Sequence, residues 1–571
     1  MAAKPLPPVT VHFLGTCSGG GPIISRNCSS LTVDFGNDIW LFDAADGTLP
    51  RLHQSPLKLT NITRIFITHL HADHVLGLVP ILTTILSGIG MNQDALSKLK
   101  SQGTEKKASI NIYGTRGLRR LVRTSLEITE VTLGGAYAVH ELLYEGETEG
   151  SVPCDADDLH VNEAVGKDIH VDQDGVWREL LQEGQAKNGK GWAVSAGPIE
   201  HRVASLGYIL QEPTPRLPLD TNTLIPLLQS NASALKELTP PISHPLSLLS
   251  HLTSLPPPPP YTLPSGDVIS PPEPSGIPPR KLVIFGDCAG GTENSTFQSM
   301  CADPSLLIHE CTNAAIPELV QRGEKGRKVR MKGMDDGLVQ RSEDQTGKQV
   351  GKEDAEVSKS ESERKQREEE KRVETRRKAQ SRGHSTPDEV GEFAKLTRAR
   401  RVVVNHFSAM FPSPRYASSE ALPSLLSPVS PYPCPTPYPP PRLPDQVPEP
   451  LPLTGSELHI RLIMQSMTDQ IDAVWKGPER KPQEADNSDP SSGASGLSHK
   501  TADARRSVAA RDFMVVRVPS HELSPIEEEE GSKLAEEAGR VMQEWKAHGG
   551  VWLEDARVKR WVGVDAIPNG S

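Results

Sequence analysis

The sequence predicts an α/β protein with one core and three insertions. Two observations carry this prediction. Short apolar runs rich in Val, Ile, Leu and Phe alternate with turn residues and with longer amphipathic segments. Between them lie stretches too rich in proline or in charge to form a packed core. A cluster of histidines that follows one of the apolar runs predicts a metal site beside this core.

The apolar runs give the order of the predicted elements. Each strand is short, rich in β-branched or aromatic residues and bounded by turn residues. Strands are predicted over residues 9–14, 39–42, 64–67, 110–113, 203–210, 281–285, 306–309 and 401–404. Helices are predicted over residues 77–86, 117–128 and 457–474.

Composition sets the domain organisation. The 571 residues include 51 Pro and only 4% aromatic residues, and the mean hydropathy is −0.41, so we expect long, poorly ordered insertions. Core segments are predicted at 1–212, 281–322 and 382–411, with C-terminal core elements and a linker at 453–519. The insertions are a Pro/Ser-rich one at 213–280, a charged one at 323–381 and a Pro-rich one at 412–452, and a C-terminal extension follows at 520–571.

Cysteine usage and the absence of apolar segments bear on the compartment. The seven cysteines are odd in number and form no CxxC pair, which argues against a disulfide scaffold or a cysteine-rich zinc finger. The N-terminus lacks the apolar stretch of a signal peptide, and no segment has about eighteen uninterrupted apolar residues. We therefore predict a protein of the cytosol or nucleus that is not secreted and has no membrane partner.

The most informative segment directly follows the predicted strand at 64–67. It reads Thr68-His69-Leu70-His71-Ala72-Asp73-His74. Neutral imidazole and carboxylate are ligands that zinc prefers. Alternate residues of an extended segment point the same way, so His69 and His71 can reach one ion, and Asp73 and His74, past the turn, a second. The spacing therefore predicts two metal ions.

Further residues of metal-ligand type stand just outside later apolar runs, where a sheet presents side chains to a cleft. Asp287 and His406 each end such a run, His140 follows one and His201 precedes one. Asp287, His406 and one of the two other histidines bring the ligands to seven. Seven ligands suit two zinc ions if the carboxylate of Asp287 bridges them. Spacing does not choose between His140 and His201.

These segments and several others resemble one known family. They are Phe13-Leu14-Gly15-Thr16-Cys17-Ser18-Gly19 and residues 26–30, 40–48, 112–118, 139–142, 201–208, 285–287, 307–311, 382–386, 405–408 and 510–514. In this order they resemble ribonuclease Z of the metallo-β-lactamase superfamily. The histidine motif alone specifies the superfamily, whereas His309-Glu310 together with His384-Ser385-Thr386 points to ribonuclease Z.

The resemblance implies a fold and a ligand set. The fold would be a four-layer αββα sandwich with the metals at one edge of its two sheets. The family's histidine in a His-Glu-Leu segment matches His140. His201 would then lie behind the ligands or beside the substrate. Two zinc ions per chain are implied, with manganese or iron(II) as alternatives. One would be bound by His69, His71 and His140, the other by Asp73, His74 and His406, and both by Asp287.

The resemblance also implies a reaction, the removal of the 3′ trailer from precursor tRNA. Two cations about 4 Å apart lower the pKa of a bridging water, so hydroxide is available at neutral pH. His384 is the candidate proton donor to the leaving 3′-oxygen, and Glu310 would orient its imidazole and raise its pKa. Asp73 is the candidate for aligning or deprotonating the hydroxide. The products would be a 3′-hydroxyl on the tRNA and a 5′-phosphate on the trailer.

Precursor tRNA needs a basic surface. Although the net charge is −11, residues 98–123 contain eight basic residues and a single acid. A solvated helix face explains this stretch equally well. The candidate substrate-binding residues are Lys106, Lys107, Arg116, Arg119, Arg120, Arg123, Ser205 and Tyr208. The family's Gly- and Lys-rich arm, which grips the tRNA elbow, is expected at about 152–190, a segment that is acidic here. Members of the short type pair as dimers, so the resemblance also implies a homodimer.

Two other classes of function remain open. A related two-metal hydrolase, such as an arylsulfatase, a cyclic-nucleotide phosphodiesterase or a thioesterase, would act on a small ester without needing Glu310, His384 or a basic surface. A non-catalytic RNA-binding scaffold would use the insertions to bind partners. Such scaffolds usually lose metal ligands, and none is missing here.

Overall fold

The structure is a computed structural model. It describes residues 9–19, 22–23, 25–86, 94, 97–98, 101–103, 106–154, 158–182, 191–317, 350–414, 455–476, 507–518, 551–555 and 560–564. Nearly all of the insertion predicted at 412–452 and most of the extension predicted at 520–571 lie outside these residues. Among the described helices, none has the length and apolarity needed to cross a bilayer.

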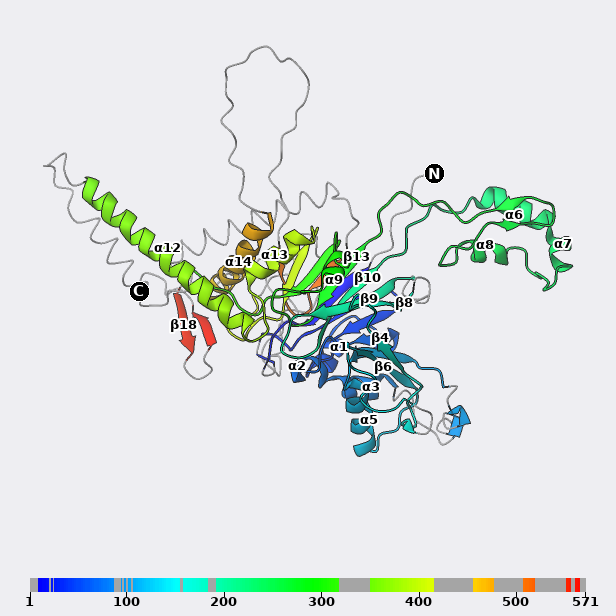
Figure 1. Ribbon diagram of the computed structural model, residues 1–571, viewed down its shortest axis with the longest axis horizontal. Coiled ribbons are helices and arrows are strands. Elements are labelled where there is room, and N and C mark those ends of the chain that lie inside the picture. The colour runs from blue at the N-terminus through cyan, green and yellow to red at the C-terminus, as the bar shows by residue number, and fades with distance from the viewer. Residues whose placement is uncertain are drawn as a thin grey trace, which may run out of the picture.

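Two mixed β-sheets pack face to face at the centre of the molecule (Figure 1). The first sheet has eight strands in the order β17-β1-β2-β3-β4-β5-β6-β7, and β3 to β7 run parallel to one another. Its strands are β1 (Thr10–Gly15), β2 (Ser30–Asp34), β3 (Ile39–Phe42), β4 (Ile62–Phe66), β5 (Ile110–Thr115), β6 (Tyr137–Leu143), β7 (Lys167–His170) and β17 (Val515–Arg517).

The second sheet has seven strands in the order β16-β15-β14-β13-β10-β9-β8. The four strands from β13 to β16 are parallel, and β10, β9 and β8 join them in antiparallel fashion. Its strands are β8 (Trp177–Leu181), β9 (Ala193–Ile199), β10 (Ser205–Gln211), β13 (Lys281–Phe285), β14 (Leu306–Glu310), β15 (Val402–Asn405) and β16 (Val508–Ala509). A separate hairpin pairs β18 (Val551–Asp555) with β19 (Arg560–Val564).

Helices cover the outer faces of both sheets. On the first sheet these are α1 (Thr48–Gln54), α3 (Leu78–Leu86) and α5 (Leu118–Ile128), whose apolar side chains share one buried cluster with those of β3, β4 and β5. On the second sheet they are α9 (Ser295–Met300), α13 (Pro387–Leu396) and α14 (Gly455–Lys476), which share another cluster with β13, β14 and β15. The expected four-layer αββα sandwich is confirmed.

Aromatic residues join the two sheets in the interior. Phe42 and Phe66 of the first sheet lie with ring centroids 5.8 and 5.2 Å from that of Tyr208 in the second. The hydroxyl of Tyr208 donates a 2.7 Å hydrogen bond to the carbonyl of Ile67. Buried aromatic pairs of this kind stabilise a core beyond their area burial. Because Ile67 is followed by the histidine motif, this contact also fixes where that motif begins.

The insertion at 213–280 is folded, contrary to the poor order that we expected. It contains α6 (Thr221–Ser230), α7 (Ala232–Lys236), α8 (Ser247–Leu252) and a short hairpin of β11 (Tyr261–Thr262) and β12 (Val268–Ile269). Buried leucines from its three helices, among them Leu228, Leu235, Leu248 and Leu252, give it a small core of its own. The expectation of poor order rested on its proline content, which does not prevent these short helices from packing together.

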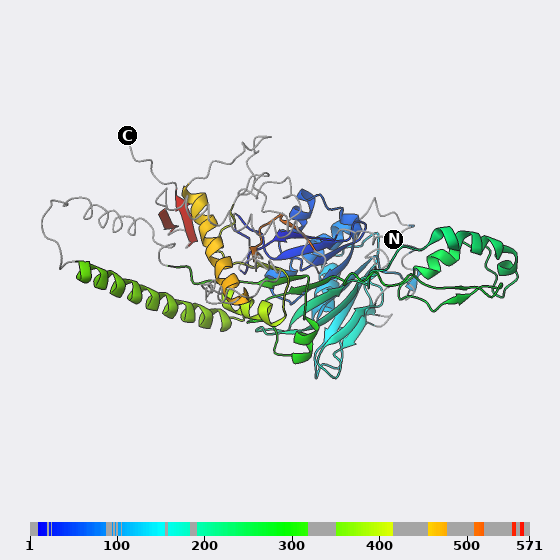
Figure 2. The same ribbon diagram turned by 90° about the horizontal axis from the view of Figure 1, so that it is seen from above.

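This folded insertion, residues 213–280, projects from the body of the molecule in both views (Figures 1 and 2). The long helix α12 (Val350–Gln380) projects from the opposite side. This helix lies in the charged insertion predicted at 323–381, so residues 350–380 of that insertion are helical. Only the C-terminal end of α12 approaches the sheets, where Arg372 and Arg376 form ion pairs with Asp388 and Glu392 of α13.

Candidate metal centre

Segments far apart in the sequence bring seven imidazole and carboxylate side chains together at one edge of the two sheets. The motif of residues 69–74 follows β4 and includes the short helix α2 (Ala72–Val75). His201 comes from the loop between β9 and β10, Asp287 follows β13, and His406 follows β15. The strand ends therefore position every member of the group.

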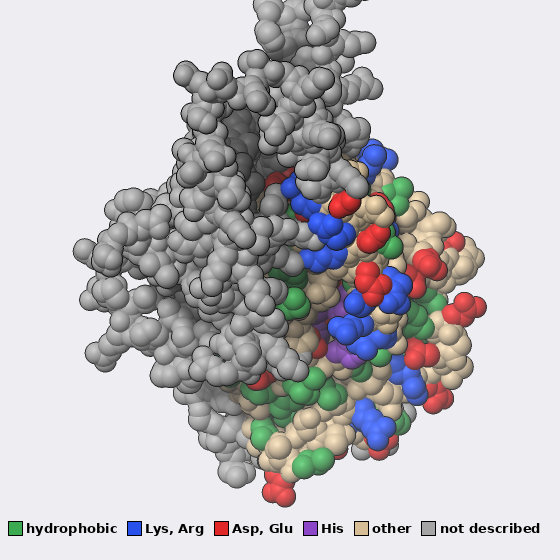
Figure 3. Space-filling view, turned by 90° about the vertical axis from the view of Figure 1, so that its left-hand side faces the viewer, with side chains coloured by type: hydrophobic (Ala, Val, Ile, Leu, Met, Phe, Trp, Pro, Cys, Tyr) green, Lys and Arg blue, Asp and Glu red, His purple; other side chains and the backbone are tan. Residues whose placement is uncertain are grey.

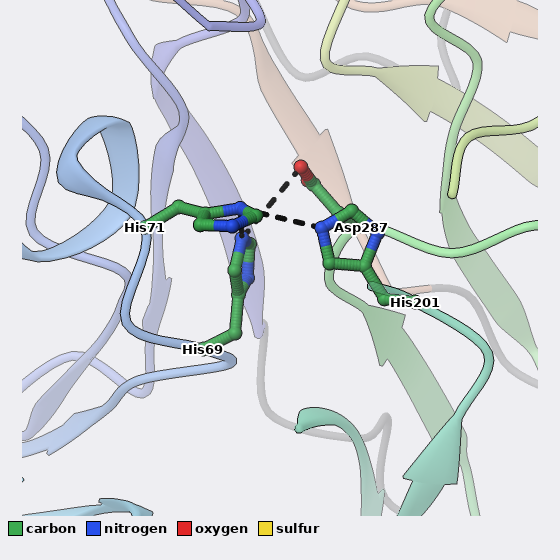
Figure 4. A group of neighbouring side chains, drawn as sticks. All are labelled: His69, His71, His201 and Asp287. Atoms are coloured by element: carbon green, nitrogen blue, oxygen red, sulfur yellow. Dashed lines mark hydrogen bonds and ion pairs between the residues drawn. The ribbon is translucent and has the colours of Figure 1, made fainter. Parts of the chain in front are cut away.

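The first cluster consists of His69, His71, His201 and Asp287, whose ligand-type atoms all lie within 4.8 Å of one another (Figure 4). His71 Nδ1 lies 3.0 Å from His69 Nε2 and 3.3 Å from His201 Nε2. Asp287 Oδ2 lies 3.7 Å from His69 Nε2. Three imidazoles and a carboxylate at this spacing form a donor set that suits zinc.

The second cluster consists of Asp73, His74 and His406, again within 4.8 Å of one another. Asp287 faces this cluster with its other oxygen, because Oδ1 lies 3.2 Å from His74 Nε2 and 3.0 Å from His406 Nε2. Asp287 Oδ1 is buried without a well-aligned hydrogen bond. A buried carboxylate oxygen in that position fits a cation between the two clusters.

The charged side chains of the two clusters shift one another's pKa values. Burial alone would raise the pKa of Asp287, but the imidazoles of His406, His74 and His69 lower it well below its usual range. Burial lowers the pKa of His69 well below its usual value, so its ring is neutral at pH 7. The pKa of His74 is raised instead, because Asp287 and Asp43 outweigh its burial. The carboxylate of Asp287 is therefore ionised at neutral pH and can neutralise divalent cations.

Neighbouring side chains fix the orientation of the ligands. Asp43 Oδ2 lies 2.7 Å from His74 Nδ1, and the same carboxylate accepts hydrogen bonds from the amide and the hydroxyl of Thr68. Thr312 Oγ1 lies 3.0 Å from His406 Nδ1. Such partners leave Nε2 of each histidine free for a metal. Sequence reasoning assigned no role to Asp43 or Thr312, although Asp43 ends an apolar run as Asp287 does.

Asp73 is oriented by a backbone group. The amide of Gly19, in the loop after β1, donates a 2.6 Å hydrogen bond to Asp73 Oδ2. His74 and His406 also approach this oxygen, with nitrogens at 3.7 and 3.6 Å. Burial alone would raise the pKa of Asp73, but His406 and His74 lower it, so the side chain is ionised at neutral pH.

His384 and Glu310 lie beside the two clusters. His384 Nδ1 is 3.1 Å from Glu310 Oε1 and 3.8 Å from Asp287 Oδ2. Burial alone would lower the pKa of His384, but the hydrogen bond and charge of Glu310 raise it above its usual value. Glu310 is itself buried and accepts hydrogen bonds from Thr312 and from the amide of Ser385. The pair that the sequence analysis singled out is thus formed.

The loop that carries His384 ends in a strong helix start. Thr386 and Glu389 form a capping box at the beginning of α13, and Pro387 occupies its first turn. This pattern satisfies amide groups that have no partner within the helix and fixes where the helix begins. His384 is therefore held two residues before a well-defined helix terminus.

The expectation that His140 joins the metal ligands is wrong in this structure. His140 lies within β6 and pairs in register with Tyr113, which is level with Phe66 of β4. His140 is therefore separated from His69 by two strand spacings across the sheet and by about three residues along the strand direction. Each of these separations is roughly 10 Å. Its Nε2 lies 3.1 Å from Asn111 Oδ1, and its ring stacks on Tyr113 at 4.6 Å. His201 takes the expected place.

Several of the predicted substrate-binding residues are buried. Arg119 is fully buried and donates to Asp168 and to backbone carbonyls, and Arg123 pairs with Glu163. The helix α5 turns these two arginines toward β6 and β7 rather than to solvent. Ser205 donates to the carbonyl of Asp287, Tyr208 belongs to the core, and Lys106 Nζ donates to the carbonyls of Val161 and Glu163. Lys107, Arg116 and Arg120 are exposed as predicted.

The described part of the segment expected to form the RNA-gripping arm contributes two strands to the sandwich. Within 152–190, the described residues include β7, which pairs with β6 in the first sheet, and β8, which pairs with β9 in the second. Residues 183–190 lie outside the described part of the chain. Among the described elements, the folded insertion at 213–280 and the helix α12 project from the body of the molecule.

Comparisons with known proteins show what this chain resembles. A family profile described as "Anti-Pycsar protein Apyc1" matches residues 9–86. "Zinc phosphodiesterase ELAC protein 1" of Bos taurus is 28% identical over 410 residues, which cover 70% of this chain and 86% of that protein. "Ribonuclease Z" of Streptococcus suis (strain 98HAH33) is 34% identical over 145 residues, covering 25% of this chain and 41% of that protein. The solved structure of human tRNase Z, short form, is 23% identical with a TM-score of 0.37, covering 70% of this chain and 93% of that one. The chain is therefore a homologue of proteins named ribonuclease Z and zinc phosphodiesterase ELAC protein 1.

Proposed function

We propose that this protein is a metal-dependent endoribonuclease that cleaves the 3′ trailer from precursor tRNA. The observation that carries the proposal is the pairing of His384 with Glu310 beside two clusters of metal-ligand residues. A proton donor in that position suits the hydrolysis of an unactivated phosphodiester, whose leaving alkoxide needs a proton. Relatives named ribonuclease Z support the assignment of the substrate.

Two zinc ions fit the donor set, and manganese or iron(II) would use similar ligands. His69, His71 and His201 would hold one ion, Asp73, His74 and His406 the other, and Asp287 would bridge both. When bound, such a pair of cations supplies hydroxide at neutral pH and neutralises the charge of the phosphodiester.

The protein's own residues would control proton positions. Asp73, held by the amide of Gly19, would accept a hydrogen bond from the attacking water and align it. Glu310 faces Nδ1 of His384, so the proton on Nε2 of His384 would pass to the leaving 3′-oxygen. The tRNA would then carry a 3′-hydroxyl and the trailer a 5′-phosphate.

Binding of the RNA would rest partly on the exposed cations Lys107, Arg116 and Arg120. Each phosphate contact of this type adds affinity that weakens as salt concentration rises. Homodimer formation and a location in the cytosol or nucleus stay predictions from the sequence. Light scattering of the purified protein and imaging of a tagged chain would test these two points.

The decisive experiment offers the purified protein a 3′-extended precursor tRNA and, separately, small esters. We expect cleavage of the precursor, loss of cleavage on chelation with EDTA, and recovery when zinc or manganese is restored. Rapid turnover of a small ester without cleavage of the precursor would contradict the proposal and favour a related hydrolase. Cleavage that survives complete removal of metal would contradict the two-metal assignment.

A further inference from the structure

Arg202 is an exposed cation at the rim of the candidate metal centre. It lies in the loop between β9 and β10, which is fixed at both ends. Before it, the amide of Glu200 donates a 2.9 Å hydrogen bond to the carbonyl of Gly291, and after it, the amide of Leu206 donates a 2.9 Å hydrogen bond to the carbonyl of Thr68. The loop therefore presents Arg202 from a defined position beside the histidines.

The guanidinium of Arg202 forms none of the ion pairs found in the described part of the chain. The preceding residue, His201, contacts both sides of the centre: its Nε2 lies 3.3 Å from His71 Nδ1, and its Nδ1 lies 2.6 Å from the carbonyl oxygen of Gly383. The backbone of Arg202 is equally close to the loop that carries His384, because a Cβ added at Gly383 would lie 3.1 Å from the amide nitrogen of Arg202. Arg202 therefore lies between the two sides of the centre, toward His71 and toward His384.

The acidic side chains of the centre itself face histidines. Asp287 and Asp73 face the imidazoles of the two clusters, and Glu310 faces His384. Because no ion pair within the described part of the chain engages Arg202, its guanidinium can bind an anionic ligand. Lys and Arg side chains lie beside the histidines on the face shown in Figure 3, as a polyanionic ligand would require.

The position of His384 indicates which phosphate this would be. If His384 protonates the leaving 3′-oxygen, the nucleotide that carries this oxygen lies on the His384 side of the centre, and its own 5′-phosphate lies beyond it. We propose that Arg202 binds this phosphate, one nucleotide 5′ of the cleaved bond. A guanidinium suits the task because its planar fork binds two phosphate oxygens at once. The assignment rests on the proposed function and adds a residue that positions the tRNA end.

A charge-deletion experiment on both partners tests the proposal. The RNA is a precursor with a single methylphosphonate, which is uncharged, at the phosphate one nucleotide 5′ of the cleaved bond. The proteins are the wild type, Arg202→Ala, Arg202→Lys and the control Lys395→Ala, which removes an exposed cation at the far end of α13. Cleavage of bis(p-nitrophenyl) phosphate, which has no neighbouring phosphate, reports on the metal centre itself.

We expect Arg202→Ala to lower kcat/KM for the precursor by roughly tenfold, mainly through KM, as loss of a charge-assisted contact would. Arg202→Lys should recover part of this loss, and Lys395→Ala and the small diester should be unaffected. The methylphosphonate should lower kcat/KM of the wild type by a similar factor. It should not lower kcat/KM of Arg202→Ala any further, because the contact is already lost in that variant.

Three results would overturn the proposal while leaving the proposed function intact. In the first, Arg202→Ala cleaves the precursor at the wild-type rate. In the second, the effects of Arg202→Ala and of the methylphosphonate multiply when the two are combined. In the third, Arg202→Ala cleaves the small diester as slowly, relative to the wild type, as it cleaves the precursor. A wild-type protein that hydrolyses the small diester but leaves the unmodified precursor uncut would instead reject the proposed function, and the assignment of Arg202 with it.

Discussion

Nδ1 of His201 donates a 2.6 Å hydrogen bond to the carbonyl oxygen of Gly383, the residue before His384. This bond fixes the tautomer of His201, so that Nε2 faces His71 and the first cluster. It also joins a candidate metal ligand to the loop that carries the candidate proton donor. The ligand cluster and the acid are therefore positioned by one shared contact.

Substitution of Gly383 should disturb this contact. Gly383 has a φ of +75°, and a Cβ added there would lie 2.5 Å from His201 Nδ1. We expect Gly383→Ala to lower metal affinity or activity by roughly 10–100-fold, as loss of an orienting partner typically does. Gly276→Ala is the matched control, because Gly276 has a φ of +79° but no atom within 4 Å of the added Cβ. Equal behaviour of the two variants in a zinc titration would contradict the role of this contact.

Metal content should distinguish His201 from His140. We expect His201→Ala to bind less than two zinc ions per chain, because it removes one of three imidazoles from the first cluster. His140→Ala should retain the metal content of the wild type, since this ring faces Asn111 and Tyr113. Elemental analysis after dialysis measures both. Loss of metal from His140→Ala, together with normal metal content in His201→Ala, would support His140 as the ligand, as the resemblance implies.

The pH dependence of cleavage should report the Glu310–His384 pair. A proton donor must be protonated, so the rate should fall as pH rises through the pKa of His384, which Glu310 raises against the effect of burial. Glu310→Gln removes the charge and should move this fall to lower pH. His384→Ala should abolish it and slow cleavage by roughly 10²–10⁴-fold with metal content unchanged. Loss of metal from His384→Ala would identify His384 as a ligand, and an unmoved pH profile in Glu310→Gln would exclude the pairing.

Arg119 should matter for stability rather than for RNA binding. It is fully buried, with a 2.7 Å ion pair to Asp168 and further hydrogen bonds to backbone carbonyls. We expect Arg119→Ala to lower the free energy of unfolding by about 3–5 kcal/mol, because it leaves the fully buried carboxylate of Glu141, 3.7 Å away, without its cation. The neighbouring, exposed Arg120→Ala should change it by less than about 0.5 kcal/mol. Urea unfolding measures both, and a normally stable Arg119→Ala that binds RNA weakly would contradict this account.

The residue patterns predicted an α/β core and most of the candidate site for a physical reason, whereas the four layers followed from the family resemblance. Residues 69–74 follow one strand, and Asp287 and His406 follow two others, so short-range patterns and strand ends suffice to find them. The choice between His140 and His201 depends on strand register instead. Register places His140 level with Phe66, within the sheet and short of the edge where the ligands meet.

Burial of charge was equally hidden from the sequence. Arg119 and Arg123 stand in a basic stretch, but their partners, Asp168 and Glu163, come from a later segment that reads as acidic. The two stretches neutralise each other across α5 and the edge of the first sheet. The folded insertion at 213–280 was not predicted, because its many prolines indicated a segment without a core. Its leucines nevertheless pack together into a small core.

The most direct test of the central claim is the mapping of both ends created when the metal-loaded protein cuts a 3′-extended precursor tRNA. The account predicts one cut after the discriminator base, a 3′-hydroxyl on the tRNA and a 5′-phosphate on the intact trailer. Stepwise trimming of the trailer, a cyclic phosphate on the tRNA, or an uncut precursor would contradict it.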